Sequence, residues 1–207
     1  MSASDKVSAA TKLKAQSSKE NGITDLLLTH RIAFVAVDSP RQSPSDKVNT
    51  NEAQAIAATV IKIYELHHDT FSPTQTVGVI VPYRNQIAEV RKALEQYHID
   101  ALHDITIDTV ERYQGSQRDY IVYGFTIQKY YQLEFLTSNV FEEDGCIIDR
   151  KLNVAITRAR EHLLMFGNPR LLSHNITFSE LLSFVRERNG YFSVELSDYL
   201  SGNFKIK

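Results

Sequence analysis

The sequence LNVAITRAREHLLMFGN, from Leu152 to Asn168, joins a helical pattern directly to a mostly apolar strand that begins at His162. We expect Arg158 and Arg160 to lie in the helical half, where a spacing of two residues at about 100° per residue sends their side chains to opposite faces. A guanidinium is planar, permanently charged and suited to phosphate, so one of these arginines is a candidate nucleotide contact. The alternative interpretation is a surface helix with ordinary arginines.

Strands and helices alternate on both sides of this stretch. Four more segments have the apolar character of buried strands: Ile32–Val37, Thr76–Pro82, Asp104–Val110 and Asp119–Ile127. The segments that follow the first two strands carry apolar residues at helical spacing, and so does the segment around Leu182, whereas Gln128–Asp149 reads as a long irregular connection. This alternation predicts an α/β fold with a doubly wound, mostly parallel sheet that helices cover on both faces.

The composition fits one such domain with short appendages. The chain has 207 residues, 43% of them hydrophobic, and a net charge of -2, which argues against a uniformly basic nucleic-acid coat but allows a local basic track. The single Cys146 excludes an internal disulfide, and neither a secretory signal nor an apolar run of membrane-spanning length is present, so we expect a cytoplasmic protein. We expect a flexible polar segment at 1–22, the domain at 23–189 and a tail at 190–207.

Ligands of such sheets bind outside the carboxyl ends of the strands. Polar clusters are expected at three of these ends: Pro82–Gln86, Thr109–Asp119 and Gly167–Pro169. In the first cluster, Tyr83 has either a base to stack on or a neighbouring helix to pack against. In the second, Gly115 permits close backbone approach to a ligand, and Thr109 and Arg112 are suited to phosphate oxygens of a nucleic-acid backbone. A plain polar loop between strands is the alternative for this second cluster.

Several catalytic motifs are absent from the sequence. No GxxxxGKS or GxxxxGKT loop is present, so the chain lacks the backbone cradle that holds nucleotide phosphates in P-loop enzymes. Neither a GxGxxG fingerprint nor a GxSxG nucleophile elbow occurs. His67, His68 and Asp69 are adjacent, but the sequence places no further ligand beside them, so we expect no metal site.

Three segments, taken in order, resemble the late motifs of superfamily 1 helicases. These are VGVIVPYRNQIAEVRKAL, ITIDTVERYQGSQRDYIVYGFT and DRKLNVAITRAREHLLMFGN. The likeness is closest to the branch of the nonsense-mediated-decay helicase and its DNA-acting relatives, and it runs from about Ile32 to Leu182. The preceding NxxEA element, with Asn49, Glu52 and Ala53, is also similar to that branch, and the same spacing of Asn49 and Glu52 is close to a helix capping box.

The resemblance implies the second RecA-like domain of a two-domain motor. In that family, ATP and Mg²⁺ are bound mainly by a first domain, which this chain lacks, and the second domain supplies an arginine finger. Carried over by motif, Arg158 is that finger, Gly115 lies near the phosphates and Gln117 lies near the ribose. Tyr83, Thr109 and Arg112 are the residues expected to contact single-stranded DNA or RNA.

The chain departs from the family pattern in two ways. The first domain is absent, and Gln117 stands where the family usually has glutamate, although an amide also accepts a hydrogen bond from a hydroxyl. We therefore expect a helicase domain whose isolated chain does not hydrolyse ATP. The alternatives are a non-catalytic remnant that binds nucleic acid or protein, and a plain α/β nucleotide-binding domain with no motor role.

Overall fold

The computed structural model describes residues 22–40, 42–113, 117–137, 140–143 and 146–206. Six strands form one sheet in the order β3-β2-β4-β7-β1-β8, and every neighbouring pair is parallel. The strands are β1 (Ile32–Ala36), β2 (Val77–Ile80), β3 (Thr106–Asp108), β4 (Arg118–Gly124), β7 (Ala159–Gly167) and β8 (Tyr191–Ser193). The expected parallel α/β fold is confirmed.

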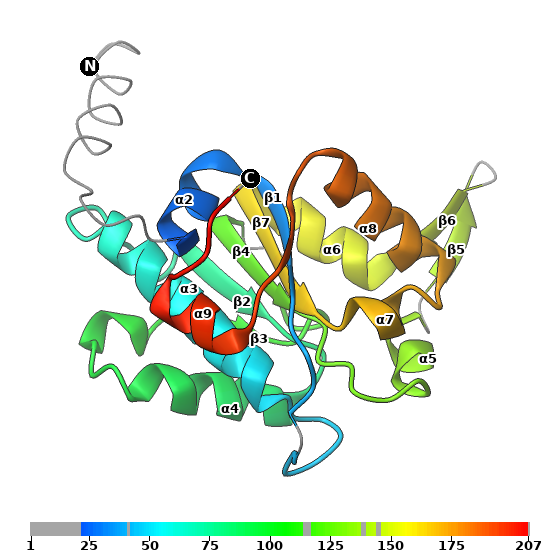
Figure 1. The fold of residues 1–207 in the computed structure, drawn as a ribbon, viewed down its shortest axis with the longest axis horizontal. Coiled ribbons are helices and arrows are strands. Elements are labelled where there is room, and N and C mark those ends of the chain that lie inside the picture. Colours follow the sequence, from blue (N-terminus) through cyan, green and yellow to red (C-terminus); the bar gives the residue numbers. More distant parts are fainter. Residues whose placement is uncertain (1–21, 41, 114–116, 138–139, 144–145, 207) are drawn as a thin grey trace.

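Helices cover both faces of this sheet (Figure 1). One layer holds α2 (Gly22–Thr29), α3 (Thr50–Leu66), α4 (Arg84–Glu95) and α9 (Leu196–Ser201). The other layer holds α5 (Gln132–Thr137), α6 (Arg150–Arg158), α7 (Pro169–Leu172) and α8 (Ile176–Glu187). Because successive strand residues point to opposite faces, Val35 packs in the first layer and its neighbour Phe34 in the second. The chain is thus doubly wound, with a core on each side of the sheet.

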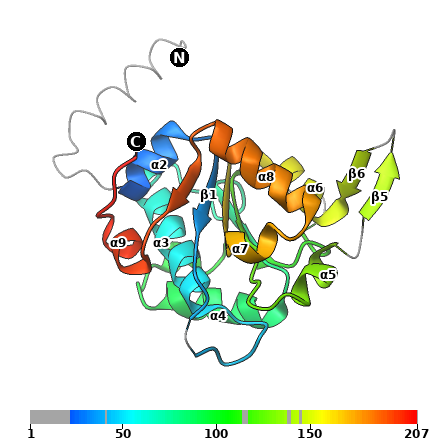
Figure 2. The same ribbon diagram turned by 45° about the vertical axis from the view of Figure 1, so that its right-hand side comes forward.

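Two expectations about this fold were wrong. The helix α6 ends at Arg158, so Arg160 belongs to β7 and not to the opposite face of the same helix. The segment Gln128–Asp149 is not irregular throughout, because it contains α5 and an antiparallel hairpin of β5 (Val140–Glu143) and β6 (Cys146–Asp149). Figure 2 shows this hairpin projecting from the body of the domain.

Both ends of the chain were expected to lie outside the domain. Residues 1–21 lie outside the described residues. At the other end, β8 pairs with β1 from Phe34 to Ala36, and the buried Tyr199 of α9 packs in the first-layer core. The segment from Gly190 to Ile206 is therefore part of the sheet and its first layer, not a tail beside them.

The NxxEA element anchors the start of α3. The side chain of Asn49 accepts a hydrogen bond from the backbone N–H of Glu52, as an N-cap does. Glu52 does not return the bond in the manner of a capping box. Its carboxyl group is fully buried and instead accepts hydrogen bonds from the backbone N–H and hydroxyl of Thr126, whereas the backbone of Asn49 bonds the side chain of Gln86. The element therefore joins α3 to β4 and α4.

None of the helices in the described part of the chain has the length and apolar character needed to cross a bilayer.

Candidate functional site

The candidate residues separate into two groups at opposite ends of the sheet. Gln117 and Arg158 lie at the amino ends of β4 and β7, because Arg118 and Ala159 are paired at the start of these two strands. Tyr83 and Thr109 follow the carboxyl ends of β2 and β3, where Ile80 pairs with Asp108. The expectation that the whole cluster Thr109–Asp119 lies at the carboxyl edge was therefore wrong.

The loop after β3 crosses the sheet, and this crossing explains the separation. Tyr113 is buried and lies over Gly78 in the middle of β2. Any side chain at Gly78 would collide with the Tyr113 hydroxyl, so glycine is required for the close approach of the loop to the strand. The loop therefore delivers Thr109 to one edge of the sheet and Gln117 to the other.

Gln117 and Arg158 meet at the amino edge. The exposed amide of Gln117 donates a hydrogen bond of 3.3 Å to the carbonyl oxygen of Thr157, one residue before Arg158. Arg118, the next residue, is buried and donates hydrogen bonds to the hydroxyl of Thr106 and to the carbonyl oxygen of Gln117. Gly115 lies outside the described residues. The amino edge thus presents one neutral amide and one guanidinium side by side.

The guanidinium of Arg158 has no acidic partner among the described residues. The side chain is partly buried, and its Nε atom is buried without a hydrogen-bond acceptor in the described part of the chain. Nε of Arg118 is also buried without an acceptor, so the property of Arg158 that suits an anion is its permanently charged guanidinium without a described acidic partner. Arg160 differs, because its guanidinium lies 3.4 Å from the carboxylate of Asp119. The chemistry at this edge therefore fits an anionic ligand such as a nucleotide phosphate at Arg158.

A cavity of about 460 Å³ opens at the carboxyl edge of the sheet. It brings together the three residues expected to contact a nucleic-acid strand, Tyr83, Thr109 and Arg112. Two further lining side chains lie outside the clusters that the sequence singled out: Lys47 from the loop before α3 and Phe135 from α5. No local pattern marks either residue, because tertiary folding alone brings them to this cavity.

The charge in this cavity is predominantly positive. Lys47, Arg84 and Arg112 line it together with a single acid, Glu111. Glu111 lies 3.5 Å from the ammonium of Lys151, and Arg112 lies 3.6 Å from Asp108 in an exposed ion pair. Lys47 and Arg84 have no ion-pair partner within the described residues. A patch of this kind is the local basic track that a protein of net charge -2 needs in order to bind phosphates.

Tyr83 packs within the protein. Its ring is buried and stacks on Phe135 with a centroid distance of 5.1 Å and an interplanar angle of 22°. Burial raises the pKa of the Tyr83 hydroxyl, which lies 3.4 Å from the side-chain amide of Gln132. Of the two possibilities for Tyr83, packing against a neighbouring helix is the one observed, because Phe135 belongs to α5.

Lys151 links this cavity to the helix that carries Arg158. Its side chain is buried, donates a hydrogen bond of 2.8 Å to the carbonyl oxygen of Phe135, and lies 3.9 Å above the centre of the Phe135 ring. Buried lysines are rare unless they are paired, and here Glu111 is the counter-charge. The start of α6 therefore contacts the carboxyl-edge cavity, and its end presents Arg158 at the amino edge.

His67, His68 and Asp69 do not gather as a set of ligands. His67 lies 3.0 Å from the Tyr120 hydroxyl, and burial lowers its pKa, whereas His68 contacts Asp69 at the surface. Groups of three or more histidine, cysteine or acidic side chains able to hold a metal ion are absent from the described part of the chain.

Comparison with known proteins finds helicases. The chain is 30% identical over 146 residues to "Regulator of nonsense transcripts 1" of Dictyostelium discoideum, covering 69% of this chain and 10% of that protein. It is 32% identical over 130 residues to "ATP-dependent helicase NAM7" of Saccharomyces cerevisiae, covering 61% and 12%. It is 28% identical over 167 residues to an uncharacterised ATP-dependent helicase of Methanocaldococcus jannaschii, covering 78% and 21%.

The chain thus spans between 10% and 21% of the length of these three relatives. A family model described as "AAA domain" matches residues 4–170, which is more than half of the chain. The likeness to helicases that the three motifs implied is confirmed. The chain belongs to the AAA domain family, and it has the fold and motifs of the C-terminal RecA-like domain of superfamily 1 helicases.

Proposed function

We propose that this chain is the C-terminal motor domain of an ATP-dependent DNA or RNA helicase. In this proposal it supplies an arginine finger and single-strand contacts to a site that it shares with an N-terminal RecA-like domain of the same protein. ATP and Mg²⁺ are then held mainly by that first domain, since this chain has no phosphate-binding loop. The proposal rests on the family membership and on the position of Arg158.

The single observation that carries the proposal is the environment of Arg158. A partly buried guanidinium without an acidic partner among the described residues stands at the amino edge of the sheet. Phosphoryl transfer spreads negative charge over the equatorial oxygens of the transferred group, and a positioned arginine stabilises that charge by roughly 10³–10⁵ in rate. Gln117 beside it has an amide oxygen that can accept a hydrogen bond from a ribose hydroxyl.

Strand contacts are assigned to the carboxyl-edge cavity. Lys47, Arg84 and Arg112 provide phosphate contacts, and Thr109 provides a hydroxyl. Lys151 connects the two sites, because its helix α6 begins at the carboxyl-edge cavity and ends at Arg158. If binding of single-stranded nucleic acid moves this helix, the position of Arg158 changes with it.

The test is the rate of ATP hydrolysis by a polypeptide that joins this chain to a first domain containing a GxxxxGKS or GxxxxGKT loop. We expect hydrolysis that a single-stranded oligonucleotide stimulates and that Arg158→Ala lowers by about 10²-fold or more. Arg158→Lys keeps the charge and loses the planar fork, so it should restore only part of the rate. Hydrolysis that does not depend on Arg158 would contradict the finger and favour the alternative, a non-catalytic remnant that binds nucleic acid or protein.

A further inference from the structure

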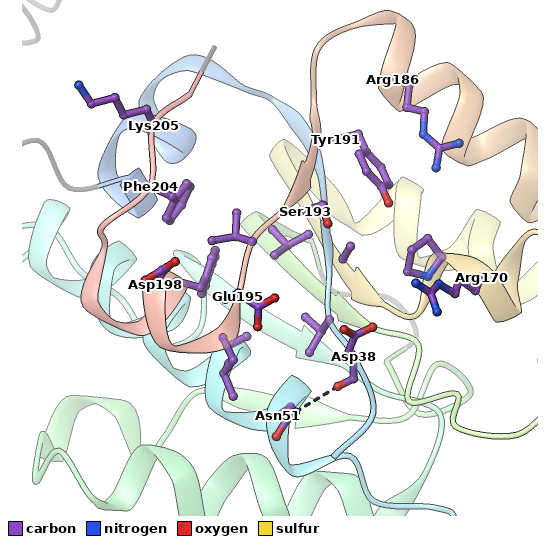
Figure 3. Close-up of a pocket in the computed structure, with 18 of the residues that line it drawn as sticks. Asp38, Asn51, Arg170, Arg186, Tyr191, Ser193, Glu195, Asp198, Phe204 and Lys205 are labelled. Carbon is purple, nitrogen blue, oxygen red and sulfur yellow. Dashed lines mark hydrogen bonds between the residues drawn. The ribbon is translucent and has the colours of Figure 1, made fainter. Parts of the chain in front are cut away.

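A second cavity, of about 750 Å³, lies at the carboxyl ends of β7, β1 and β8 (Figure 3). It shares no lining residue with the carboxyl-edge cavity near Tyr83 that is described above. Its volume lies within the range of about 300–1,000 Å³ that is typical of small-molecule sites. The roles proposed above use none of its residues, so its chemistry requires a separate explanation.

The topology of the sheet makes this position a crevice. After β1 the chain turns to α3 in one helical layer, and after β7 it turns to α7 and α8 in the other layer. The two strands are nevertheless neighbours, and the backbone N–H of Val37 donates a hydrogen bond of 2.9 Å to the carbonyl oxygen of Gly167. Adjacent strands whose connections leave to opposite faces form the switch point at which open α/β sheets bind ligands.

Charged side chains of both signs line the cavity. Three are acidic, Asp38, Glu195 and Asp198, and three are basic, Arg170, Arg186 and Lys205. Figure 3 shows Arg170, Arg186 and Tyr191 on one side and Glu195 and Asp198 on the other. Apolar residues such as Val35, Ala55 and Leu196 complete the lining. The cavity therefore has two arginines on one side and two carboxylates on the other, with Asp38 between Arg170 and Glu195 and Lys205 on the side of Asp198.

Four of these charged groups are not neutralised across the cavity. Arg170 and Arg186 form no salt bridge with another described residue, and the same holds for Asp38 and Glu195. Arg186 instead lies over the Tyr191 ring, 4.3 Å from its centre. Arginines suit phosphate through two parallel hydrogen bonds, and carboxylates accept hydrogen bonds from sugar hydroxyls. A ligand with a phosphate at one end and hydroxyls at the other would contact both the arginines and the carboxylates.

Aromatic surface for a base is scarce in this cavity. The ring of Tyr191 is already stacked on Phe34 with a centroid distance of 5.8 Å and is covered by Arg186. Phe204 is stacked on Tyr199 with a centroid distance of 5.3 Å. The recognised chemistry is therefore that of the sugar and the phosphate. We propose that this cavity is a binding site for a sugar phosphate, with the phosphate on Arg170 and Arg186 and the hydroxyls on Asp38 and Glu195.

The sugar-phosphate unit has two possible sources, a free metabolite and the backbone of a nucleic-acid strand. The charge balance favours the free metabolite, because three acids oppose three bases here, whereas the carboxyl-edge cavity near Tyr83 has three bases and one acid. A polyanionic strand gains from net positive charge, and this cavity has none. We therefore assign the cavity to a free sugar phosphate and not to a nucleic-acid strand.

The test uses the full chain and ribose 5-phosphate, with binding measured by calorimetry and by amide chemical shifts in NMR spectra. Ribose and inorganic phosphate are the partial ligands, and each should bind at least about tenfold more weakly than ribose 5-phosphate. Arg170→Ala and Glu195→Gln should each weaken binding about tenfold, the loss of one charge-assisted hydrogen bond. Arg188→Ala is the matched control, since Arg188 is exposed, lies over Phe184 and is not among the lining residues.

Two outcomes would overturn the proposal. Ribose 5-phosphate that shifts no amide around this cavity at millimolar concentration, or that binds equally well to the Arg170→Ala variant, would exclude the site. A single-stranded oligonucleotide that shifts these amides at a lower concentration than ribose 5-phosphate would show that the site binds a nucleic-acid backbone. That result would overturn the free-metabolite assignment. Folding of each variant is checked by its thermal midpoint, since Arg170 and Glu195 are exposed side chains whose replacement should leave the core intact.

Discussion

The side-chain amide of Gln117 donates a 3.3 Å hydrogen bond to the carbonyl oxygen of Thr157, and this bond joins the residue before β4 to the end of α6, which carries Arg158. The same side chain has an amide oxygen that can accept a hydrogen bond. A glutamate at this position accepts more strongly but has no proton for the Thr157 carbonyl. In our proposal Gln117 thus both contacts the nucleotide sugar and holds the end of the helix that carries Arg158.

We expect Gln117→Glu, in a two-domain protein that contains this chain, to tighten ATP binding by roughly tenfold at most. A charge-assisted hydrogen bond to the ribose is stronger than a neutral one by about 1 kcal/mol, and loss of the Thr157 contact offsets part of the gain. The measurement compares ATP with its 2′,3′-dideoxy analogue in the unmodified protein and in the variant. An equal preference for the hydroxyls in both proteins would mean that position 117 does not contact the ribose.

Arg158 and Arg160 are the sharpest matched pair for testing the finger. In the same two-domain protein, Arg158→Ala should lower kcat about 10²-fold or more while nucleotide affinity stays within about an order of magnitude, since a finger acts on transition-state charge. Arg160→Ala should change kcat little, because it removes only an exposed ion pair with Asp119. Steady-state kinetics of both variants decide the matter, and a larger loss at Arg160 would reverse the assignment.

Arg160 lies in β7, although its sequence context predicted a helix. Ala159, Arg160 and Glu161 are all good helix formers, so local propensity continues the helix past Arg158. Pairing of Ala159 with Arg118 of β4 overrides that preference, and this long-range contact leaves no local signal. The three-residue strand β8 was missed for a related reason, since Tyr191–Ser193 is too short for a period to be recognised.

Longer elements and the site motifs were better determined by the sequence. The long helix α3 and the apolar strands β1, β2 and β4 follow from their hydrophobic patterns alone. The three residues chosen for strand contact do line one cavity, but its Lys47 and the Phe135 ring come from segments with no motif. Sequence motifs thus identified most of the residues that line the site, whereas Lys47 and Phe135 are brought to it by tertiary packing alone.

The isolated chain should hydrolyse ATP no faster than buffer does. It lacks a phosphate-binding loop, and one arginine without bound phosphates and Mg²⁺ has no reacting group to stabilise. Release of inorganic phosphate from ATP by the purified 207-residue chain is the measurement, with Arg158→Ala as the control for contaminating enzymes. Turnover that disappears in the Arg158→Ala protein would show that the chain is catalytically complete.

Single-strand binding by the chain alone should be weak and sensitive to salt. Only the few cations of the carboxyl-edge cavity contact phosphates, so the logarithm of affinity should fall with the logarithm of salt concentration by a slope of about 0.7 per contact. Lys47→Ala with Arg84→Ala should reduce that slope by between about 1 and 1.5, whereas Lys62→Ala, on an exposed face of α3 and paired with Glu65, should leave it unchanged. Fluorescence anisotropy with an oligonucleotide provides the slopes, and tight binding at high salt would contradict this picture.

The stability of the fold should decrease as pH rises, because of Glu52. Burial raises the pKa of the Glu52 carboxyl group to about 8, against a smaller opposing effect of its hydrogen bonds to Thr126. In the unfolded chain the group titrates near 4.5, so between pH 4.5 and about 8 the native state holds a proton that the unfolded state does not. Stability from this group is therefore complete below pH 4.5 and is lost by up to about 1.4 kcal/mol per pH unit as pH rises through that window.

Glu52→Gln removes this titration while keeping a side chain of the same shape. We expect the free energy of unfolding of the variant, measured by urea denaturation, to depend less on pH between about 5 and 8 than that of the unmodified chain, with the largest relative gain for the variant near pH 8. His67, whose pKa burial lowers, titrates in the same window with the opposite sign, since its native state resists protonation at low pH. His67→Gln is therefore made both in the unmodified chain and in the Glu52→Gln variant, so that the contributions of Glu52 and His67 to the pH dependence can be separated. Unchanged pH dependence on Glu52→Gln in the background that lacks His67 would show that Glu52 is ionised in the native fold, held by the two donors of Thr126.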